Sequence, residues 1–203
     1  MRVAIVTFDG FNELDSFIGL GLLNRLRADG VTAQITSPTA QVTSMNGVTV
    51  TAQQPLEWAN EADAVWFGSG IYTRAIAANS ALLDRLALDP VRQTICGQCS
   101  GTLLMARLGL LADLPACTDT TTKPWVVEAG VRVVDTAFVA RGGIATAGGC
   151  LASQYLAAWL MWRAAGEQAA ARGLHYAAPV GEKDAYVARL LEVVRPFMSR
   201  DAS

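Results

Sequence analysis

Apolar residues along the chain alternate between short continuous runs and longer stretches with helical spacing. Short strand-like runs, each followed by small or polar residues, occupy residues 3–8, 32–36, 64–67 and 91–96. Between the first two runs, apolar residues recur on one side of a helix expected over residues 14–28, at Leu14, Phe17, Ile18, Leu22 and Leu26. Short buried strands that alternate with helices are typical of a mostly parallel sheet. The sequence therefore predicts an α/β fold with helices on both faces of such a sheet.

The rest of the chain continues this alternation. Met45-Asn46-Gly47 predicts a tight hairpin turn, with a returning strand at residues 48–51. Further short strands are expected at residues 132–134, 138–140 and 144–146. Further helices are expected at residues 80–88, at 100–108, after Gly148-Gly149 up to about residue 171, and at 184–197. No repeat, low-complexity segment or linker interrupts the pattern, so we expect residues 1–203 to form a single domain.

Composition narrows the classes of partner. Hydrophobic residues make up 52% of the chain and charged residues only 17%, which predicts an extra buried surface, most simply a homodimer contact. The 16 basic and 18 acidic residues form no long basic stripe, so nucleic acid is not an expected partner. No leader pattern begins the chain, and no apolar helix is long enough to span a bilayer. We therefore expect no membrane association and a cytoplasmic location.

The most informative stretch is Gly97-Gln98-Cys99-Ser100-Gly101. A strand pattern precedes it and a helical apolar run follows it, as in a nucleophile elbow with cysteine as the nucleophile. The residues around an elbow nucleophile must be small because the backbone is sharply bent and closely packed there. A sulfur near a helix N-terminus also ionises more readily, so we expect the pKa of Cys99 to lie below the free-cysteine value of about 8.5.

The other three cysteines are interpreted as small core residues: Cys96, Cys117 and Cys150. Cys96 and Cys99 do form a C-x-x-C pair, but Cys96 falls on the buried strand rather than before a helix, which disfavours a redox dithiol. A zinc site would need a second C-x-x-C, and His175 is the only histidine. We therefore expect no metal ion and no cofactor, and the sequence assigns His175 no role.

Two further segments should meet Cys99, because ligands of open α/β sheets bind where parallel strands end. One is Gly68-Ser69-Gly70, which lacks the third glycine of a dinucleotide loop because Thr73 stands there. This segment is either a plain tight turn or a source of backbone N–H groups that stabilise an oxyanion.

The second segment follows the first strand and carries three acids. Asp15 stands at the start of the first helix, where it is either a surface charge that favours the helix N-terminus or a partly buried acid that faces Cys99. Asp9 and Glu13 compete for the second role. Spacing alone does not choose among the three.

Together, Asn12-Glu13-Leu14-Asp15, the Gly-x-Gly segment and the elbow resemble the ThiJ/PfpI superfamily. The match is most specific at Cys99-Ser100-Gly101 with Leu108-Gly109-Leu110-Leu111 behind it. The resemblance covers nearly the whole chain and implies a flavodoxin-like fold related to class I glutamine amidotransferases. It also implies that Asp15 is the acid that hydrogen-bonds Cys99, with a backbone donor at Gly70 or its neighbours.

The sequence departs from many members of that superfamily in having no histidine near residues 118–122 and an Asp as the acid. Asp15, Cys99 and the hydroxyl of Ser100 are similar to the isocyanide hydratase branch, which typically has Thr at the last position. We therefore expect Ser100 to be the third catalytic residue, with a hydroxyl that positions the attacking water or the Asp15 carboxyl group. The resemblance implies a small-molecule substrate and a hydratase or hydrolase reaction at a carbon–nitrogen electrophile. Two alternatives stay open: a non-catalytic thiol sensor of oxidative stress that uses Cys99, and an amidase-like or peptidase-like enzyme.

Overall fold

The computed structural model describes residues 1–198 and is built around a seven-stranded sheet in the order β5-β2-β1-β6-β7-β9-β8. Adjacent strands run parallel except for the antiparallel pair β8–β9 at one edge. The sheet strands are β1 (Arg2–Val6), β2 (Thr32–Ser37), β5 (Gln54–Pro55), β6 (Ala64–Phe67), β7 (Thr94–Gln98), β8 (Phe138–Arg141) and β9 (Ile144–Ala147). The expected fold class, a mostly parallel α/β sheet, is confirmed.

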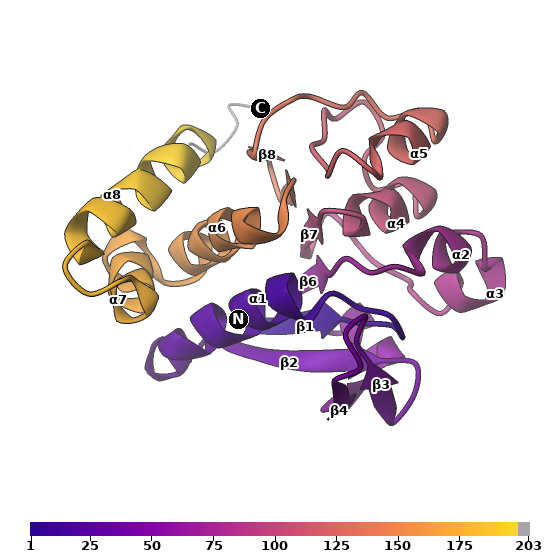
Figure 1. Ribbon diagram of the computed structural model, residues 1–203, viewed down its shortest axis with the longest axis horizontal. Coiled ribbons are helices and arrows are strands. Elements are labelled where there is room, and N and C mark those ends of the chain that lie inside the picture. The colour runs from indigo at the N-terminus through magenta and orange to yellow at the C-terminus, as the bar shows by residue number, and fades with distance from the viewer. Residues whose placement is uncertain (199–203) are drawn as a thin grey trace.

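Helices cover both faces of this sheet (Figure 1). On one face lie α1 (Glu13–Leu23) with the 3-10 turn η1 (Asn24–Asp29), then α6 (Ser153–Ala165), α7 (Glu167–Ala177), α8 (Lys183–Val194) and η4 (Arg195–Phe197). On the other face lie η2 (Leu56–Asn60), α2 (Thr73–Ala77), α3 (Ser80–Leu83), α4 (Gly101–Arg107) and α5 (Lys123–Glu128). Within residues 1–198, the structure contains no helix long and apolar enough to cross a membrane.

The central strands are buried along nearly all of their length because both of their faces are covered. All four residues of β6 are buried, and they alternate between the two cores on either side of the sheet. Trp66 packs into the core beneath α1 and α6, whereas Val65 and Phe67 pack beneath α4. Trp66 pairs with Ile5 in β1 and with Cys96 in β7, and all three side chains belong to the core beneath α1 and α6. This two-sided burial explains why these strands appear in the sequence as continuous apolar runs.

Several expected elements have different limits in the structure. The long helix expected up to about residue 171 is interrupted at Gly166, where φ is +86°, and becomes α6 and α7. Residues 132–134 form no strand and contribute only a single bridge between Val133 and Ala116. Residues 80–88 contain only the four-residue α3, and the sequence analysis missed α2. Short elements pack through few residues, so their periodicity is too brief to detect.

The predicted hairpin forms a separate two-stranded sheet of β3 (Gln41–Thr43) and β4 (Thr49–Thr51). Its register pairs Val42 with Val50, and Gly47 takes the positive φ of +86° that the turn requires. The backbone N–H of Met45 donates to the carbonyl of Phe11, 2.8 Å away, which attaches the hairpin to the loop after β1.

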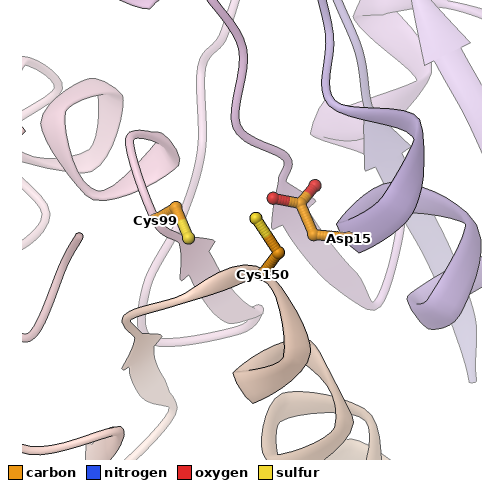
Figure 2. A group of neighbouring side chains, drawn as sticks. All are labelled: Asp15, Cys99 and Cys150. Carbon is orange, nitrogen blue, oxygen red and sulfur yellow. The ribbon is translucent and has the colours of Figure 1, made fainter. Parts of the chain in front are cut away.

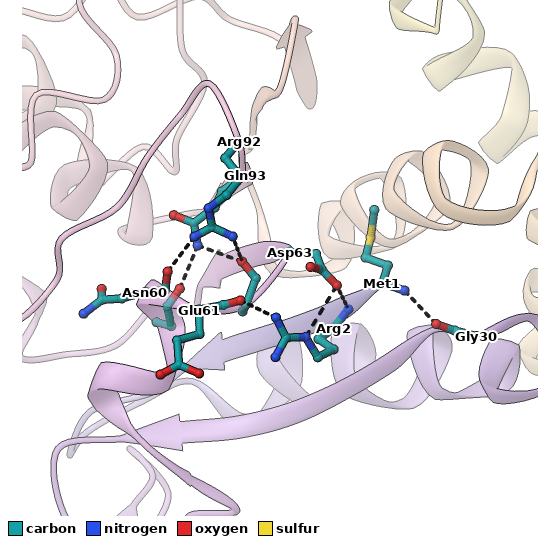
Figure 3. A network of polar contacts seen from close by, with 10 residues as sticks. Met1, Arg2, Gly30, Asn60, Glu61, Asp63, Arg92 and Gln93 are labelled. Carbon is teal, nitrogen blue, oxygen red and sulfur yellow. Dashed lines mark hydrogen bonds and ion pairs between the residues drawn. The ribbon is translucent and has the colours of Figure 1, made fainter.

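A network of polar contacts closes the amino-terminal edge of the sheet (Figure 3). The backbone N–H of Arg2 donates to Asp63 at 2.6 Å, and the side-chain amide of Gln93 donates to the carbonyls of Ala59 and Ala62 at 2.8 and 2.9 Å. The Arg92 guanidinium donates to the Ala62 carbonyl at 3.2 Å. These residues lie at the start of β1 or just before β6 and β7, so this edge is occupied by structural contacts. The carboxyl-terminal edge carries the candidate site.

The close packing of the elbow gives a prediction about stability. A Cβ atom at Gly101 would lie 2.2 Å from the carbonyl oxygen of Phe67, a backbone atom that cannot move aside. Gly101→Ala should therefore lower the free energy of unfolding by about 1–3 kcal/mol, measured by urea denaturation. The matched control is Gly21→Ala in α1, where a Cβ meets nothing within 4 Å. That variant should be more stable than wild type by about 0.5–1 kcal/mol. Equal stability of the two variants would contradict the packing argument.

Candidate active site

Cys99 stands on a sharp turn between β7 and α4. Its φ is +47°, a left-handed conformation that is uncommon for a residue with a side chain and is found at functional turns. The backbone N–H of Cys99 donates to the Ala147 carbonyl at 2.8 Å, and its carbonyl accepts from the Thr118 hydroxyl at 2.7 Å. Only 4% of Cys99 is exposed. The residue therefore has the backbone geometry of a nucleophile elbow, held from both sides.

Asp15 lies in the first turn of α1, directly after the loop that leaves β1. Asn12 caps this helix, because its side-chain oxygen accepts from the backbone N–H of Leu14 at 3.0 Å. The Asp15 side chain is fully buried, and the Ser69 hydroxyl donates to its Oδ2 atom at 2.5 Å. The Ser16 hydroxyl lies 3.3 Å from Oδ1. Both carboxylate oxygens thus have a hydroxyl partner.

The other two acids of this loop face away from the thiol. Asp9 accepts from the backbone N–H of Thr43 in the hairpin at 2.9 Å. Hydrogen bonds from Asn46 and Ser44 help to lower the pKa of Glu13, whose burial acts in the opposite direction. Of the three acids that spacing could not separate, Asp15 is the one that the fold brings to Cys99.

Figure 2 shows Asp15, Cys99 and Cys150 side by side, each coming from a different segment. One carboxylate oxygen and the two sulfur atoms all lie within 4.8 Å of one another. The interpretation of Cys150 as a core residue was wrong, because this side chain is half-buried and belongs to the cluster, whereas Cys96 and Cys117 are fully buried. These three groups could also hold a metal ion. The absence of metal expected from the sequence stays a prediction.

Burial dominates the titration of Asp15. Loss of water around the carboxyl group raises its pKa from 3.8 to about 7, although hydrogen bonds from Ser69 and Ser16 favour the charged form. The carboxyl group therefore gains and loses a proton near neutral pH, which is the property that a general acid or base needs.

The expectation of an unusually acidic Cys99 was wrong. Burial, followed by the negative charges of Asp15 and Cys150, raises the pKa of the Cys99 thiol above its ordinary value. A hydrogen bond from the side chain of Gln98 acts in the opposite direction but does not outweigh them. The thiol thus keeps its proton until a neighbouring group removes it, and Asp15 is the titratable carboxyl group beside it.

The remaining predicted site residues lie around the cluster, and each already has a partner. The Ser100 hydroxyl accepts from the backbone N–H of Gly70 at 3.1 Å and shares a hydrogen bond with Thr73 at 2.8 Å. The backbone N–H of Gly68 donates to the Val6 carbonyl at 3.3 Å. Stabilisation of an oxyanion by Gly68, Ser69 or Gly70 stays a prediction, and it requires a donor in this segment to exchange its partner.

Sequence reasoning missed two amide side chains that contact the sulfurs. The Gln98 side-chain amide donates to Cys99 Sγ at 3.2 Å and to the Gly149 carbonyl at 2.8 Å. The Asn12 amide donates to Cys150 Sγ at 3.1 Å. The sequence did indicate a structural role for Asn12, because an asparagine directly before an acidic helical turn is typical of a helix N-cap. For Gln98, the sequence contained no indication beyond its position next to Cys99 in the elbow.

His175 lies outside this cluster. It is exposed on α7, and its Nε2 atom is 3.8 Å from Asp184 on α8. A hollow of about 370 Å³ lies between α1, α7 and α8, lined mainly by apolar side chains such as Leu22 and Leu190. None of the three cluster residues lines it, so we assign it no part in the chemistry.

No protein-family model and no curated protein matches this sequence. Solved structures do match. A ThiJ/PfpI family protein from Pseudomonas syringae aligns at 17% identity with a TM-score of 0.76, over 97% of this chain and 86% of that chain. Drosophila melanogaster DJ-1beta aligns at 18% identity with a TM-score of 0.74, over 87% and 96%.

A DJ-1 superfamily protein from Salmonella typhimurium aligns at 21% identity with a TM-score of 0.70, over 96% of this chain and 97% of that chain. The matches extend over most of each chain, so they concern the whole architecture rather than a shared motif. This chain therefore has the flavodoxin-like fold of the ThiJ/PfpI and DJ-1 proteins.

Proposed function

We propose that this chain is a ThiJ/PfpI superfamily enzyme that adds water to a small carbon–nitrogen electrophile, as an isocyanide hydratase does. One observation carries the proposal: a buried carboxyl group whose pKa is about 7 lies within 4.8 Å of an elbow cysteine. The pair combines a nucleophile with a group that exchanges one proton near neutral pH. Asp15 and Cys99 are the catalytic residues of this proposal.

In the first half of the reaction, the Asp15 carboxylate removes the thiol proton of Cys99 as the sulfur attacks the terminal carbon of the isocyanide. The sulfur lone pair forms the new carbon–sulfur bond. Asp15 then gives its proton to that carbon, whose own lone pair accepts it. The product is a thioimidate, and the proton has moved from sulfur to oxygen to carbon. The raised pKa of the thiol makes this base necessary.

In the second half, water attacks the carbon of the thioimidate while Asp15 accepts a proton from it. The nitrogen gains a proton, the carbon–sulfur bond breaks, and an N-substituted formamide leaves. Cys99 recovers its proton, so one water molecule has been added in total. In this scheme Ser69 orients the Asp15 carboxyl group, because its hydroxyl donates to Oδ2 at 2.5 Å. Ser100 positions the Gly70 segment through their 3.1 Å contact.

Peptide cleavage fits the same residues less well. An amine leaving group needs a proton donor as the carbon–nitrogen bond breaks, and cysteine peptidases use an imidazole for this purpose. The only histidine of the chain, His175, lies on α7 and pairs with Asp184 on α8, outside the cluster. An isocyanide needs only one mobile proton at a time, which a single carboxyl group can supply and recover.

The test is turnover by the purified wild-type protein. Alkyl isocyanides, nitriles, primary amides and peptide anilides are each incubated with the protein, and the products are followed by proton NMR. We expect formamide from the isocyanide and no cleavage of the peptide. Peptidase or amidase turnover without formamide would replace this proposal with the amidase-like alternative. No turnover of any substrate would favour the thiol-sensor alternative.

We also propose that the protein is a homodimer. The fraction of charged residues is only 17%, and Leu14, Ile71 and Tyr72 are 49%, 55% and 55% exposed. Such side chains are enriched in interfaces between protein chains. Sedimentation velocity at micromolar concentration should show a species of about twice 21.5 kDa. A single species at the monomer mass would exclude the dimer.

A further inference from the structure

A second thiol lies beside the elbow cysteine, and the proposed hydration does not use it. Cys150 Sγ lies within 4.8 Å of Cys99 Sγ, although the two residues are distant in the sequence. They are neighbours because β7 and β9 pair directly, and each cysteine follows the end of its strand. The fold thereby places two sulfurs at one point on the edge of the sheet (Figure 2).

The two loops are also linked by a shared hydrogen-bond donor. The Gln98 side-chain amide donates to Cys99 Sγ at 3.2 Å and to the carbonyl of Gly149, the residue before Cys150, at 2.8 Å. The Asn12 amide donates to Cys150 Sγ at 3.1 Å. Each sulfur thus accepts one amide N–H, which orients it.

A disulfide requires the two sulfurs to approach to about 2 Å, so one loop must move. Cys99 is held through its backbone N–H and its carbonyl, by Ala147 and Thr118. Cys150 follows Gly149, whose φ is +89°. A Cβ atom added at Gly149 would have no neighbour within 4 Å. Gly149 therefore gives the turn before Cys150 conformational freedom. The Cys150 carbonyl accepts from the Ser153 hydroxyl at 2.6 Å and its sulfur accepts from Asn12 at 3.1 Å, so movement of Cys150 toward Cys99 breaks these side-chain contacts.

The exposure of the two thiols also differs. Cys99 is 4% exposed and Cys150 is half-buried, while the next residue, Leu151, is 63% exposed. Cys150 thus lies at the outer side of the cluster and is the more accessible of the two thiols.

We propose that Cys150 is the resolving thiol for an oxidised Cys99, so that the pair reduces a hydroperoxide and forms an intramolecular disulfide. Asp15 takes the thiol proton as the Cys99 sulfur attacks the nearer peroxide oxygen, the oxygen–oxygen bond breaks, and Asp15 passes that proton to the leaving oxygen, which departs as an alcohol or water. The resulting Cys99 sulfenic acid then condenses with the Cys150 thiol and releases water. The two thiols lose two electrons in total, and the hydroperoxide gains them.

This pairing limits the oxidation of Cys99 to a reversible state. Without a nearby thiol, a sulfenic acid reacts with further peroxide to a sulfinic acid, which ordinary thiols do not reduce. With Cys150 beside it, the disulfide forms first and a dithiol reductant restores both cysteines. The disulfide also blocks the nucleophile of the proposed hydratase, but the inference does not depend on that activity.

The test is a thiol map of the full chain, pre-treated with a chelator and a reductant so that no bound metal ion masks the cysteines. The protein is then exposed to one equivalent of hydrogen peroxide, alkylated and digested. We expect an intact mass lower by about 2 Da, a disulfide between the peptides of Cys99 and Cys150, and full reversal by dithiothreitol. Cys150→Ser should instead accumulate sulfenic and sulfinic acid at Cys99, trapped in part by dimedone. Cys117→Ser, a buried thiol outside the cluster, should behave as wild type.

The thiol states of the wild-type protein after peroxide treatment test the proposal even if a variant folds poorly. Sulfinic acid at Cys99 together with an unmodified, alkylated Cys150 would overturn the proposal. A disulfide that joins Cys99 to Cys96 or Cys117, or one that joins two chains, would overturn it as well. These readouts are masses of thiol states, so they remain valid if isocyanide hydration fails its own test.

Discussion

Cys99→Ala should lose at least about 10³-fold of the rate at which the wild-type protein converts an alkyl isocyanide to its formamide. The reason is that no other group of the cluster can take its place as the nucleophile on the strained turn. Cys150 has a sulfur within 4.8 Å, but it lies on a different loop without the elbow geometry. Formamide production is measured by NMR at saturating isocyanide.

Cys117→Ala is the matched control for this loss. Cys117 is also buried, but its thiol donates to the Thr146 carbonyl and does not reach the cluster. The control should keep the wild-type rate, and circular dichroism should show that both variants are folded. If Cys99→Ala retained most of the activity while Cys150→Ala lost it, Cys150 rather than Cys99 would be the nucleophile.

Asp15→Asn should lower the same rate by about 10²-fold or more, because the amide can neither accept the thiol proton nor return it. The wild-type rate should also fall as the pH drops below about 7, since Asp15 is protonated there and no longer acts as a base. Glu13→Gln is the matched control, because Glu13 faces the hairpin. Its rate and its pH profile should be those of wild type. A wild-type profile that is flat between pH 5 and 8 would contradict the role of Asp15.

The same variant should change the stability in a pH-dependent way. The pKa of Asp15 rises from 3.8 to about 7 on folding, so the folded protein binds this proton more tightly than the unfolded chain does. The wild-type protein therefore loses stability as the pH rises from about 4 to 7, up to roughly 4 kcal/mol. Asp15→Asn removes this loss. It should be about 1–4 kcal/mol more stable than wild type at pH 8, and the gain should disappear below pH 4. Urea denaturation at both pH values measures it.

Local sequence predicted the elbow well, because its causes are local. Gly97 and Gly101 are required by close contacts: a Cβ at Gly97 would lie 2.6 Å from Met105 Sδ, and a Cβ at Gly101 would lie 2.2 Å from the Phe67 carbonyl. A small residue on each side of a cysteine, between a strand pattern and a helix pattern, therefore predicts the turn. The central strands were predictable for a similar reason, since burial on both faces favours apolar residues at most positions.

Spacing did not choose among the acids, and although the family resemblance indicated Asp15, only the tertiary structure shows why. Asp9, Glu13 and Asp15 are close in the sequence, but each extends from the loop or helix in its own direction. The hairpin engages Asp9 and Glu13, whereas Asp15 meets Ser69 from the end of β6. Neither the position of the hairpin nor the contact between β1 and β6 is visible in the segment that carries the acids.

The sequence by itself determined the α/β class, the elbow and the candidacy of Cys99, because each depends on residues that are adjacent in the chain. The tertiary structure decided the rest of the site. Cys150 joins Cys99 only because β9 pairs with β7, and sheet order depends on packing over the whole chain. The pKa values of Asp15 and Cys99 likewise follow from burial by several separate segments. Desolvation depends on all atoms around a group, so a sequence pattern that identifies the right residue types does not fix their protonation.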